Sequence, residues 1–184
     1  MHWQLVAAEL AQFLSALHTI DTTSGPPGGL HNYHRGAHPA VYDQAARAYI
    51  HQFSGAIDAA HALAVWERAM RSQWQQPAVW VHGDLASGNI LIKEGQLAAV
   101  IDFGCMGVGD PACDLTIAWT LLRGEARQTF KDRIGLDPDT WARARGWALW
   151  KAGFEWVALD NKNSPAAQKQ VQILGDILEE NACE

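Results

Sequence analysis

The sequence lacks the features that mark membrane-spanning and secreted proteins. No apolar run approaches the roughly 20 residues that span a bilayer, and no charged start followed by a small-residue cleavage site marks a signal peptide. Cysteine is scarce: Cys105, Cys113 and Cys183 are odd in number and lack metal-site spacing. We therefore expect reduced thiols, a cytoplasmic location and no membrane partner.

Positive charge is also in short supply. Lysine and arginine together number 14 against 20 acidic residues, which gives a net charge of −6. This balance argues against nucleic acid as a partner and mildly favours a cationic substrate. The 184 residues, 48% apolar and 18% charged, suit one compact domain spanning residues 1–184, and no internal repeat or low-complexity linker divides them.

A dense block of motifs occupies the middle of the chain, VWVHGDLASGNILIKEGQLAAVIDFGCMGVGDPACDL from Val79 to Leu115. Two apolar runs in it flank residues 93–96, whose Glu-Gly pair suits a tight turn, so the runs are predicted to pair as an antiparallel hairpin. That pairing places Asn89, at the start of one strand, beside Asp102, at the end of the other. Asp84 arrives on the loop that leads into the first strand. Two carboxylates and an amide are thus predicted to converge.

This convergence suits phosphoryl transfer, in which a hydroxyl must lie in line with a γ-phosphate held by Mg²⁺. Asp84 is the candidate catalytic residue, placed to orient and deprotonate the hydroxyl. Asn89 and Asp102 are the candidate metal ligands, because their oxygens suit Mg²⁺. The alternative is that Asp84 is a turn former and Asp102 a strand-end cap, which is common for Asp beside Gly.

The same motifs resemble the catalytic core of the aminoglycoside phosphotransferase family, a branch of the protein-kinase-like fold. HGDLASGN stands where protein kinases carry the HRD-to-Asn catalytic loop, IDFG stands where they carry DFG, and GVGDPACDL also matches the family. The resemblance implies transfer from ATP or GTP, with Mg²⁺, to a hydroxyl of a small, aminoglycoside-like molecule, and hence antibiotic resistance. Gly83 replaces the arginine of HRD, and the six positions between Gly104 and Asp110 leave no room for an activation loop. A small-molecule substrate is therefore favoured over a protein.

Four further residues are assigned supporting roles by their position and by this resemblance. His82 is expected to be a buried scaffold histidine, bonded to backbone near Asp102. Asp114 is expected to brace the loop that carries Asp84. Leu91 and Ile101 are expected under the adenine and ribose of the nucleotide, with a plain core role as the alternative.

An acidic surface for a polycationic substrate is available near the C-terminus. Glu155 and Asp160 fall on the predicted penultimate helix, and Glu179, Glu180 and Glu184 follow. An ordinary solvated helix face accounts for these residues equally well.

Helical periodicity dominates the rest of the chain. The sequence predicts an α+β, mainly helical fold, the C-terminal lobe of the protein-kinase-like fold, with a short β-hairpin carrying the catalytic motifs. A loop is expected over Asp21 to Arg35, and helices over 3–20, 41–53, 57–74, 110–122, 125–134, 139–161 and 165–181.

The N-terminal nucleotide lobe of such kinases has no counterpart in this sequence. No GxGxxG occurs, and the first lysine is Lys93, which is expected to point toward the hairpin turn. The sequence is thus predicted to be a fragment or a natural truncation. Nothing in it is expected to replace the lysine and backbone amides that hold the nucleotide phosphates in complete kinases, so turnover should be slow, and the exposed cleft should favour self-association. A catalytically silent binding or scaffold module that cannot hold ATP remains the alternative.

Overall fold

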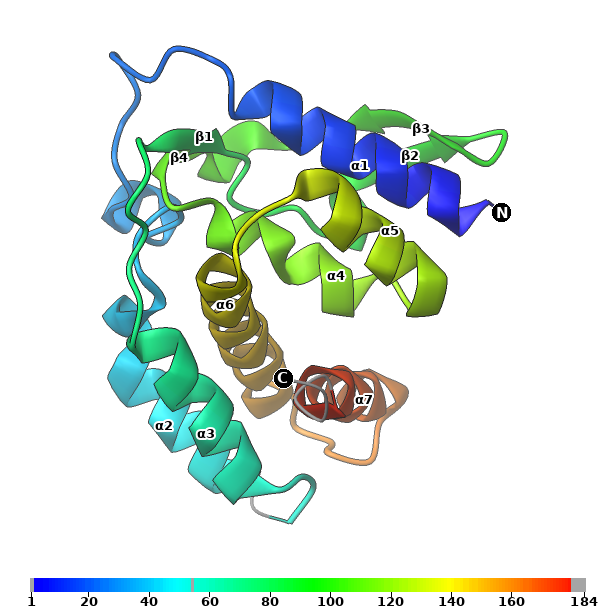
Figure 1. Cartoon of the computed structure of the whole chain (residues 1–184). Coiled ribbons are helices and arrows are strands. Elements are labelled where there is room, and N and C mark those ends of the chain that lie inside the picture. The colour runs from blue at the N-terminus through cyan, green and yellow to red at the C-terminus, as the bar shows by residue number, and fades with distance from the viewer. Residues whose placement is uncertain (1, 54, 180–184) are drawn as a thin grey trace.

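The computed structural model describes residues 2–53 and 55–179, and within them helices surround two small antiparallel sheets (Figure 1). None of the described helices is both long and apolar enough to cross a bilayer. The helices are α1 Trp3–Leu17, α2 Asp43–Gln52, α3 Ala59–Met70, α4 Ile117–Thr120, α5 Gly124–Ile134, α6 Pro138–Val157 and α7 Pro165–Glu179. The strands are β1 Val79–Val81, β2 Ile90–Lys93, β3 Gln96–Val100 and β4 Gly107–Gly109.

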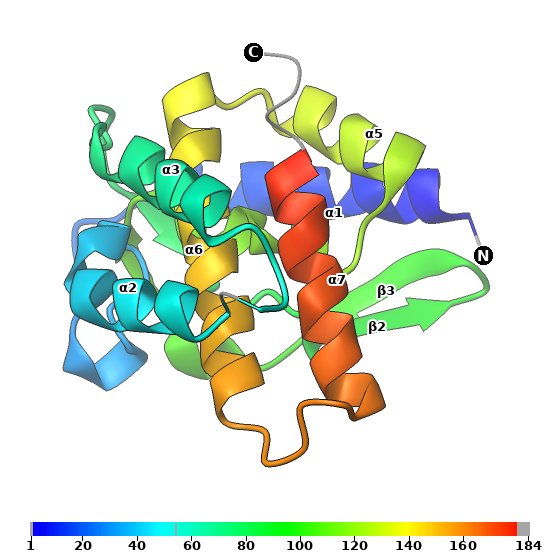
Figure 2. The ribbon, with the colours of Figure 1, turned by 90° about the horizontal axis from the view of Figure 1, so that it is seen from below.

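Helix α6 forms the centre of the helical part. It packs against α2 and α3 on one side and α7 on the other (Figure 2), and it is buried on nearly every face from Thr140 to Trp150. A helix that is buried all round needs apolar residues all round, and four tryptophans in α6 meet that need. Its start is fixed by Asp137, whose carboxylate accepts a hydrogen bond from the Thr140 N–H, with Pro138 in the first turn.

The predicted hairpin is confirmed. Strand β2 pairs antiparallel with β3, with Ile90 opposite Val100 and Lys93 opposite Gln96. The turn residues Glu94 and Gly95 both have positive φ, 55° and 84°, as a two-residue hairpin turn requires. Helix α1 lies along β3, as Figure 1 shows.

Strand β1 pairs with β4 rather than with the hairpin, and the segment 21–38 packs against β4. The Val108 N–H donates to the Pro26 carbonyl at 2.8 Å, and the Asp110 N–H donates to the Gly36 carbonyl at 2.7 Å. The approach is close, because a Cβ on Gly109 would lie 2.0 Å from the Gly36 carbonyl oxygen. The loop predicted over Asp21 to Arg35 is therefore fixed beside the central motif block.

The predicted helix over 139–161 is wrong at its C-terminal end, because α6 stops at Val157. The ammonium group of Lys162 donates hydrogen bonds to the carbonyls of Trp156, Val157 and Leu159, which satisfies the last turn of the helix. Asp160 consequently lies beyond the helix. Glu180 and Glu184 fall outside the described residues.

Candidate functional site

His82 links the loop after β1 to the end of the hairpin. Its side chain is fully buried, and its Nδ1 accepts a hydrogen bond from the Asp84 N–H at 3.3 Å. That contact assigns the proton to Nε2, which lies 3.0 Å from the Ile101 carbonyl oxygen and donates to it. The histidine side chain therefore connects the backbone of Asp84 to that of Ile101, the residue before Asp102.

Asp114 holds the backbone of the same loop. Its fully buried carboxylate accepts the backbone N–H groups of His82 at 2.7 Å and Gly83 at 2.8 Å. Burial raises the pKa of Asp114, and these two donors offset the effect only in part. Gly83 has φ of 82°, and a Cβ there would lie 2.1 Å from the Cys105 carbonyl oxygen, so this crowded turn requires glycine.

Asp84 and Asn89 are in direct contact. The Asn89 amide nitrogen donates to the Asp84 carbonyl oxygen at 2.9 Å and to its Oδ2 at 3.3 Å. Asp102 adopts a left-handed backbone conformation, with φ of 63° and ψ of 70°, and its Oδ1 accepts the Gly104 N–H at 3.3 Å. Burial first, and then the charges of Asp84 and Asp102, raise the pKa of the Cys105 thiol. Both carboxylates therefore lie close to Cys105.

The donor set fits a magnesium ion. The hydrogen bonds of Asn89 use its amide nitrogen, which leaves Oδ1 available, and Asp102 adds a carboxylate oxygen. Such hard oxygen ligands suit Mg²⁺, which usually takes one or two protein ligands and completes its shell with water and phosphate. No group of three or more His, Cys, Asp or Glu residues suited to a metal occurs in the described part of the chain, so a bound ion would depend on this smaller set.

Sequence reasoning missed Lys151, which extends from α6 to the site. Its Nζ lies 2.8 Å from Asp84 Oδ1. Partial burial raises the pKa of Asp84, but the hydrogen bond and charge of Lys151, helped by Arg35 and His82, lower it below its ordinary value. The site therefore contains a cation that the sequence did not predict, and this cation is paired with Asp84. No local pattern could have revealed this pair, because 67 positions separate its members.

A cavity of about 600 Å³ opens beside Asp84. Glu155, one of the predicted substrate residues, lines this cavity, and its carboxylate accepts a hydrogen bond from Gln170 Nε2 at 2.7 Å. Asp160 is not among the lining residues. The cavity is lined by Tyr33, Arg35, Tyr42, Asp84, Cys105, Trp150, Lys151, Phe154 and Glu155.

Leu91 and Ile101 lie outside this cavity, on the exposed side of the hairpin. Their side chains are 48% and 40% exposed, so neither is a plain core residue. Phe103, which follows Asp102 in the chain, is 39% exposed. Contact with a nucleotide is compatible with this exposure.

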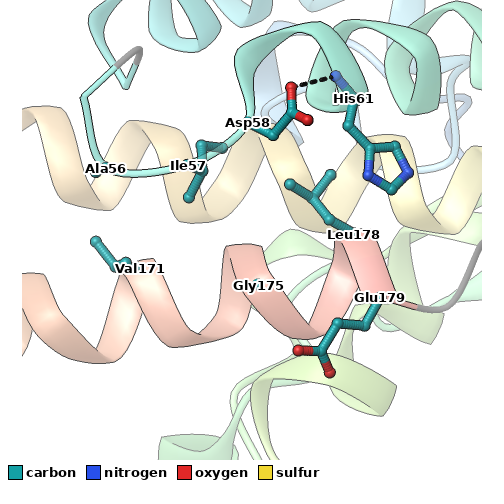
Figure 3. A pocket seen from close by; sticks show the side chains of 8 residues that line it. All are labelled: Ala56, Ile57, Asp58, His61, Val171, Gly175, Leu178 and Glu179. Atoms are coloured by element: carbon teal, nitrogen blue, oxygen red, sulfur yellow. Dashed lines mark hydrogen bonds between the residues drawn. The ribbon is translucent and has the colours of Figure 1, made fainter.

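A second cavity, of about 510 Å³, separates the start of α3 from α7 (Figure 3). Val171 and Leu178 of α7 face Ile57 and Asp58 across it, and the Asp58 carboxylate is used to cap α3 by accepting the His61 N–H. None of the motif residues lines this cavity. The candidate site is therefore the cavity at Asp84.

Comparisons with known proteins address the family and the fold of the chain. A family model described as "Phosphotransferase enzyme family" matches residues 4–147. The chain belongs to the phosphotransferase enzyme family. It is similar to an aminoglycoside 3'-phosphotransferase from Enterococcus faecalis, with 31% identity over 80 residues that cover 41% of this chain and 30% of that protein.

Solved structures of phosphotransferases share the fold. The GDP and kanamycin complex of APH(2")-IIia superposes with a TM-score of 0.64 at 16% identity, over 98% of this chain and 64% of that chain. A ternary complex of APH(4)-Ia with ADP and hygromycin B superposes with a TM-score of 0.62 at 19% identity. The superposition covers 100% of this chain and 67% of that chain. The described fold is the C-terminal lobe of the protein-kinase-like fold, and the chain spans less than two thirds of the first of these structures.

Proposed function

We propose that this chain supplies the acceptor-binding and metal-binding lobe of a small-molecule kinase, which transfers a phosphoryl group from ATP or GTP to a hydroxyl. The observation that carries the proposal is the Asp84 carboxylate, held between Asn89 and Lys151 at the edge of a cavity of ligand size. Membership of the phosphotransferase enzyme family supports the reaction class. Nucleotides and aminoglycosides named in the complexes of its structural relatives support a nucleotide donor and a hydroxylated acceptor.

The residues of the site have separate tasks in this proposal. Asp84 receives the acceptor hydroxyl, takes its proton as the oxygen attacks the γ-phosphorus, and so converts an alcohol into a phosphate ester with release of the nucleoside diphosphate. Its lowered pKa keeps the carboxylate ionised, and a carboxylate with two bonded neighbours still has lone pairs for the hydroxyl. Lys151 and Asn89 fix its orientation, while Asp114 and His82 hold its loop.

Asn89 and Asp102 are the residues that would hold Mg²⁺. When bound, the ion supplies positive charge to the phosphate oxygens of the nucleotide. Leu91 and Ile101 would offer the adenine and ribose an apolar surface next to that position.

The test is the substitution Asp84→Asn in the complete gene product, expressed from the start of its reading frame. Loss of the base should lower kcat by about 10²- to 10⁴-fold and leave nucleotide affinity unchanged. Asp132→Asn, on the exposed face of α5, is the matched control and should change neither quantity. ADP formation and nucleotide calorimetry provide the two readouts.

Two outcomes would contradict the proposal. If nucleotide affinity falls in Asp84→Asn while kcat for bound substrate is kept, Asp84 is not the base. If the parent protein binds nucleotide and forms no ADP with any acceptor, the lobe is a silent binding module.

A further inference from the structure

Arg35 presents an unpaired guanidinium group to the cavity beside Asp84. Its Cζ lies 5.1 Å from the ring centroid of Trp147 and 5.2 Å from that of Trp150. Across residues 2–53 and 55–179 the guanidinium makes neither a hydrogen bond nor an ion pair, and its Nε is buried without a partner. A guanidinium held over aromatic rings in this way keeps its N–H donors for a ligand.

Aromatic side chains form one wall of the same cavity. Tyr42 stacks on Trp150 with ring centroids 4.0 Å apart, and Trp150 stacks on Phe154 at 5.9 Å, both at an interplanar angle of 19°. Phe154 is 53% exposed and Tyr33 is 64% exposed, although both line the cavity. Exposed aromatic surface in a ligand-sized cavity favours a ligand with an apolar or aromatic body.

The balance of charge in the cavity disfavours a polycation. Two of its lining residues, Asp84 and Glu155, are acidic, and each already accepts a hydrogen bond, from Lys151 and Gln170 respectively. A molecule with several ammonium groups needs carboxylates that are free to pair with it. Among the charged side chains that line the cavity, Arg35 is the one without a hydrogen bond.

We propose that this cavity binds a hydroxylated small molecule carrying an oxyanion, such as a carboxylate, and an apolar or aromatic body, and that a polycationic sugar is not its acceptor. The oxyanion pairs with Arg35, whose planar fork of donors matches a carboxylate. The body lies against Phe154 and Tyr33, and the hydroxyl meets Asp84. The inference rests on the proposed function in one respect, because it takes Asp84 to be the group that receives the hydroxyl.

Binding to the complete gene product tests the inference without any need for turnover. Calorimetry would compare three probes that share a benzyl group and a hydroxyl: 3-phenyllactate is anionic, 3-phenyl-1,2-propanediol is neutral and phenylalaninol is cationic. Kanamycin is the polycation. We expect phenyllactate to bind at least about tenfold more tightly than the diol, with phenylalaninol and kanamycin weaker still.

Substitutions of Arg35 identify the group responsible. Arg35→Gln should abolish the preference for phenyllactate over the diol. Arg35→Lys keeps the positive charge, so this variant should still bind phenyllactate more tightly than the diol. Lys131→Gln is the matched control, because Lys131 lies 4.9 Å above the ring of Trp141 yet does not line this cavity. Thermal unfolding of each variant verifies that the fold is kept.

Three results would overturn the inference: kanamycin binding most tightly, phenyllactate showing no Arg35-dependent binding up to about 10 mM, or Arg35→Gln weakening ATP alone. The last result would assign Arg35 to the phosphate donor. Failure of the proposed function gives a different pattern. Arg35-dependent binding of phenyllactate without ADP formation would support this inference and contradict the transfer reaction. Phosphorylation of kanamycin alone would support the transfer reaction and contradict this inference.

Discussion

His18, at the C-terminal end of α1, is a partly buried histidine outside the site. Its Nε2 has no hydrogen-bond partner within the described chain, and burial lowers its pKa to about 4 from an ordinary 6.5. Between these two values the unfolded chain binds more protons at this residue than the folded chain does, so acid favours unfolding. The native protein therefore holds His18 neutral.

The corresponding prediction concerns stability between pH 7 and pH 4. The free energy of unfolding should fall by up to about 3 kcal/mol as the pH drops from 6.5 to 4, because protonation places an unpaired charge in the interior. Urea unfolding of His18→Gln should show a clearly shallower decline. His31→Gln, at an exposed position, is the control. Parallel pH profiles for the parent and His18→Gln would contradict the assignment.

Single residues also show where sequence reasoning succeeds. The buried position of His82 is predicted from its place in the motif, and the bracing contact of Asp114 is predicted from the family resemblance. The sequence does not predict Arg35 and Lys151, because both come to the cavity beside Asp84 from distant segments and neither belongs to a local motif. Side chains that meet only through tertiary packing leave no spacing signal in one sequence.

At the level of elements, a buried ion pair joins the residue that follows β4 to α6. Arg143 Nε lies 2.6 Å from Asp110 Oδ2, with both side chains at most 5% exposed. Arg143 also donates to Ser72 Oγ at 2.9 Å and to Thr140 Oγ1 at 3.0 Å. The other oxygen of Asp110 accepts the Ala112 N–H at the start of the next turn. The pair thus fixes the segment after the hairpin to the central helix.

Breaking this pair from one side should be costly. Arg143→Met leaves the Asp110 carboxylate buried and unpaired, and we expect a loss of about 3–5 kcal/mol in the free energy of unfolding. The double variant Asp110→Asn/Arg143→Met should recover part of that loss, since Asn removes the charge and keeps an oxygen for Ala112.

Arg68→Met provides the comparison, because Arg68 pairs with Asp139 at the surface and should contribute less than about 1 kcal/mol. Chemical denaturation measures all three variants. A loss in Arg143→Met no larger than in Arg68→Met would show that the buried charge is compensated in another way.

Some elements were predicted well and others were not, because some depend on neighbouring residues and others on contacts between residues far apart in the sequence. The hairpin depends on two adjacent apolar runs and a Glu-Gly turn, all within 11 residues, and its antiparallel pairing is confirmed. The pairing of β1 with β4 links residues 79 and 109, and the end of α6 depends on a lysine beyond it. Neither feature has a local pattern that a single sequence displays.

For the whole molecule, the exposed apolar surface of Leu91, Ile101 and Phe103 should drive weak self-association. Leu91→Lys places a charge on this surface and should weaken association by about tenfold or more. Leu30→Lys is the control, because Leu30 is 86% exposed and lies in a separate loop. Sedimentation velocity over a range of concentrations would test this, and equal association of both variants with the parent would exclude the hairpin surface.

The contact between Gly36 and Gly109 has a consequence for protein engineering. The Gly36 carbonyl accepts the Asp110 N–H, and there is no space for a side chain on Gly109. The backbone is therefore anchored one residue from Arg35, which lines the cavity beside Asp84. Libraries that lengthen or shorten this segment would disturb the contact between Gly36 and Gly109, and with it the ion pair of Asp110 with Arg143. Libraries that vary the side chain at position 35, with the glycines left in place, would alter ligand preference on an unchanged frame.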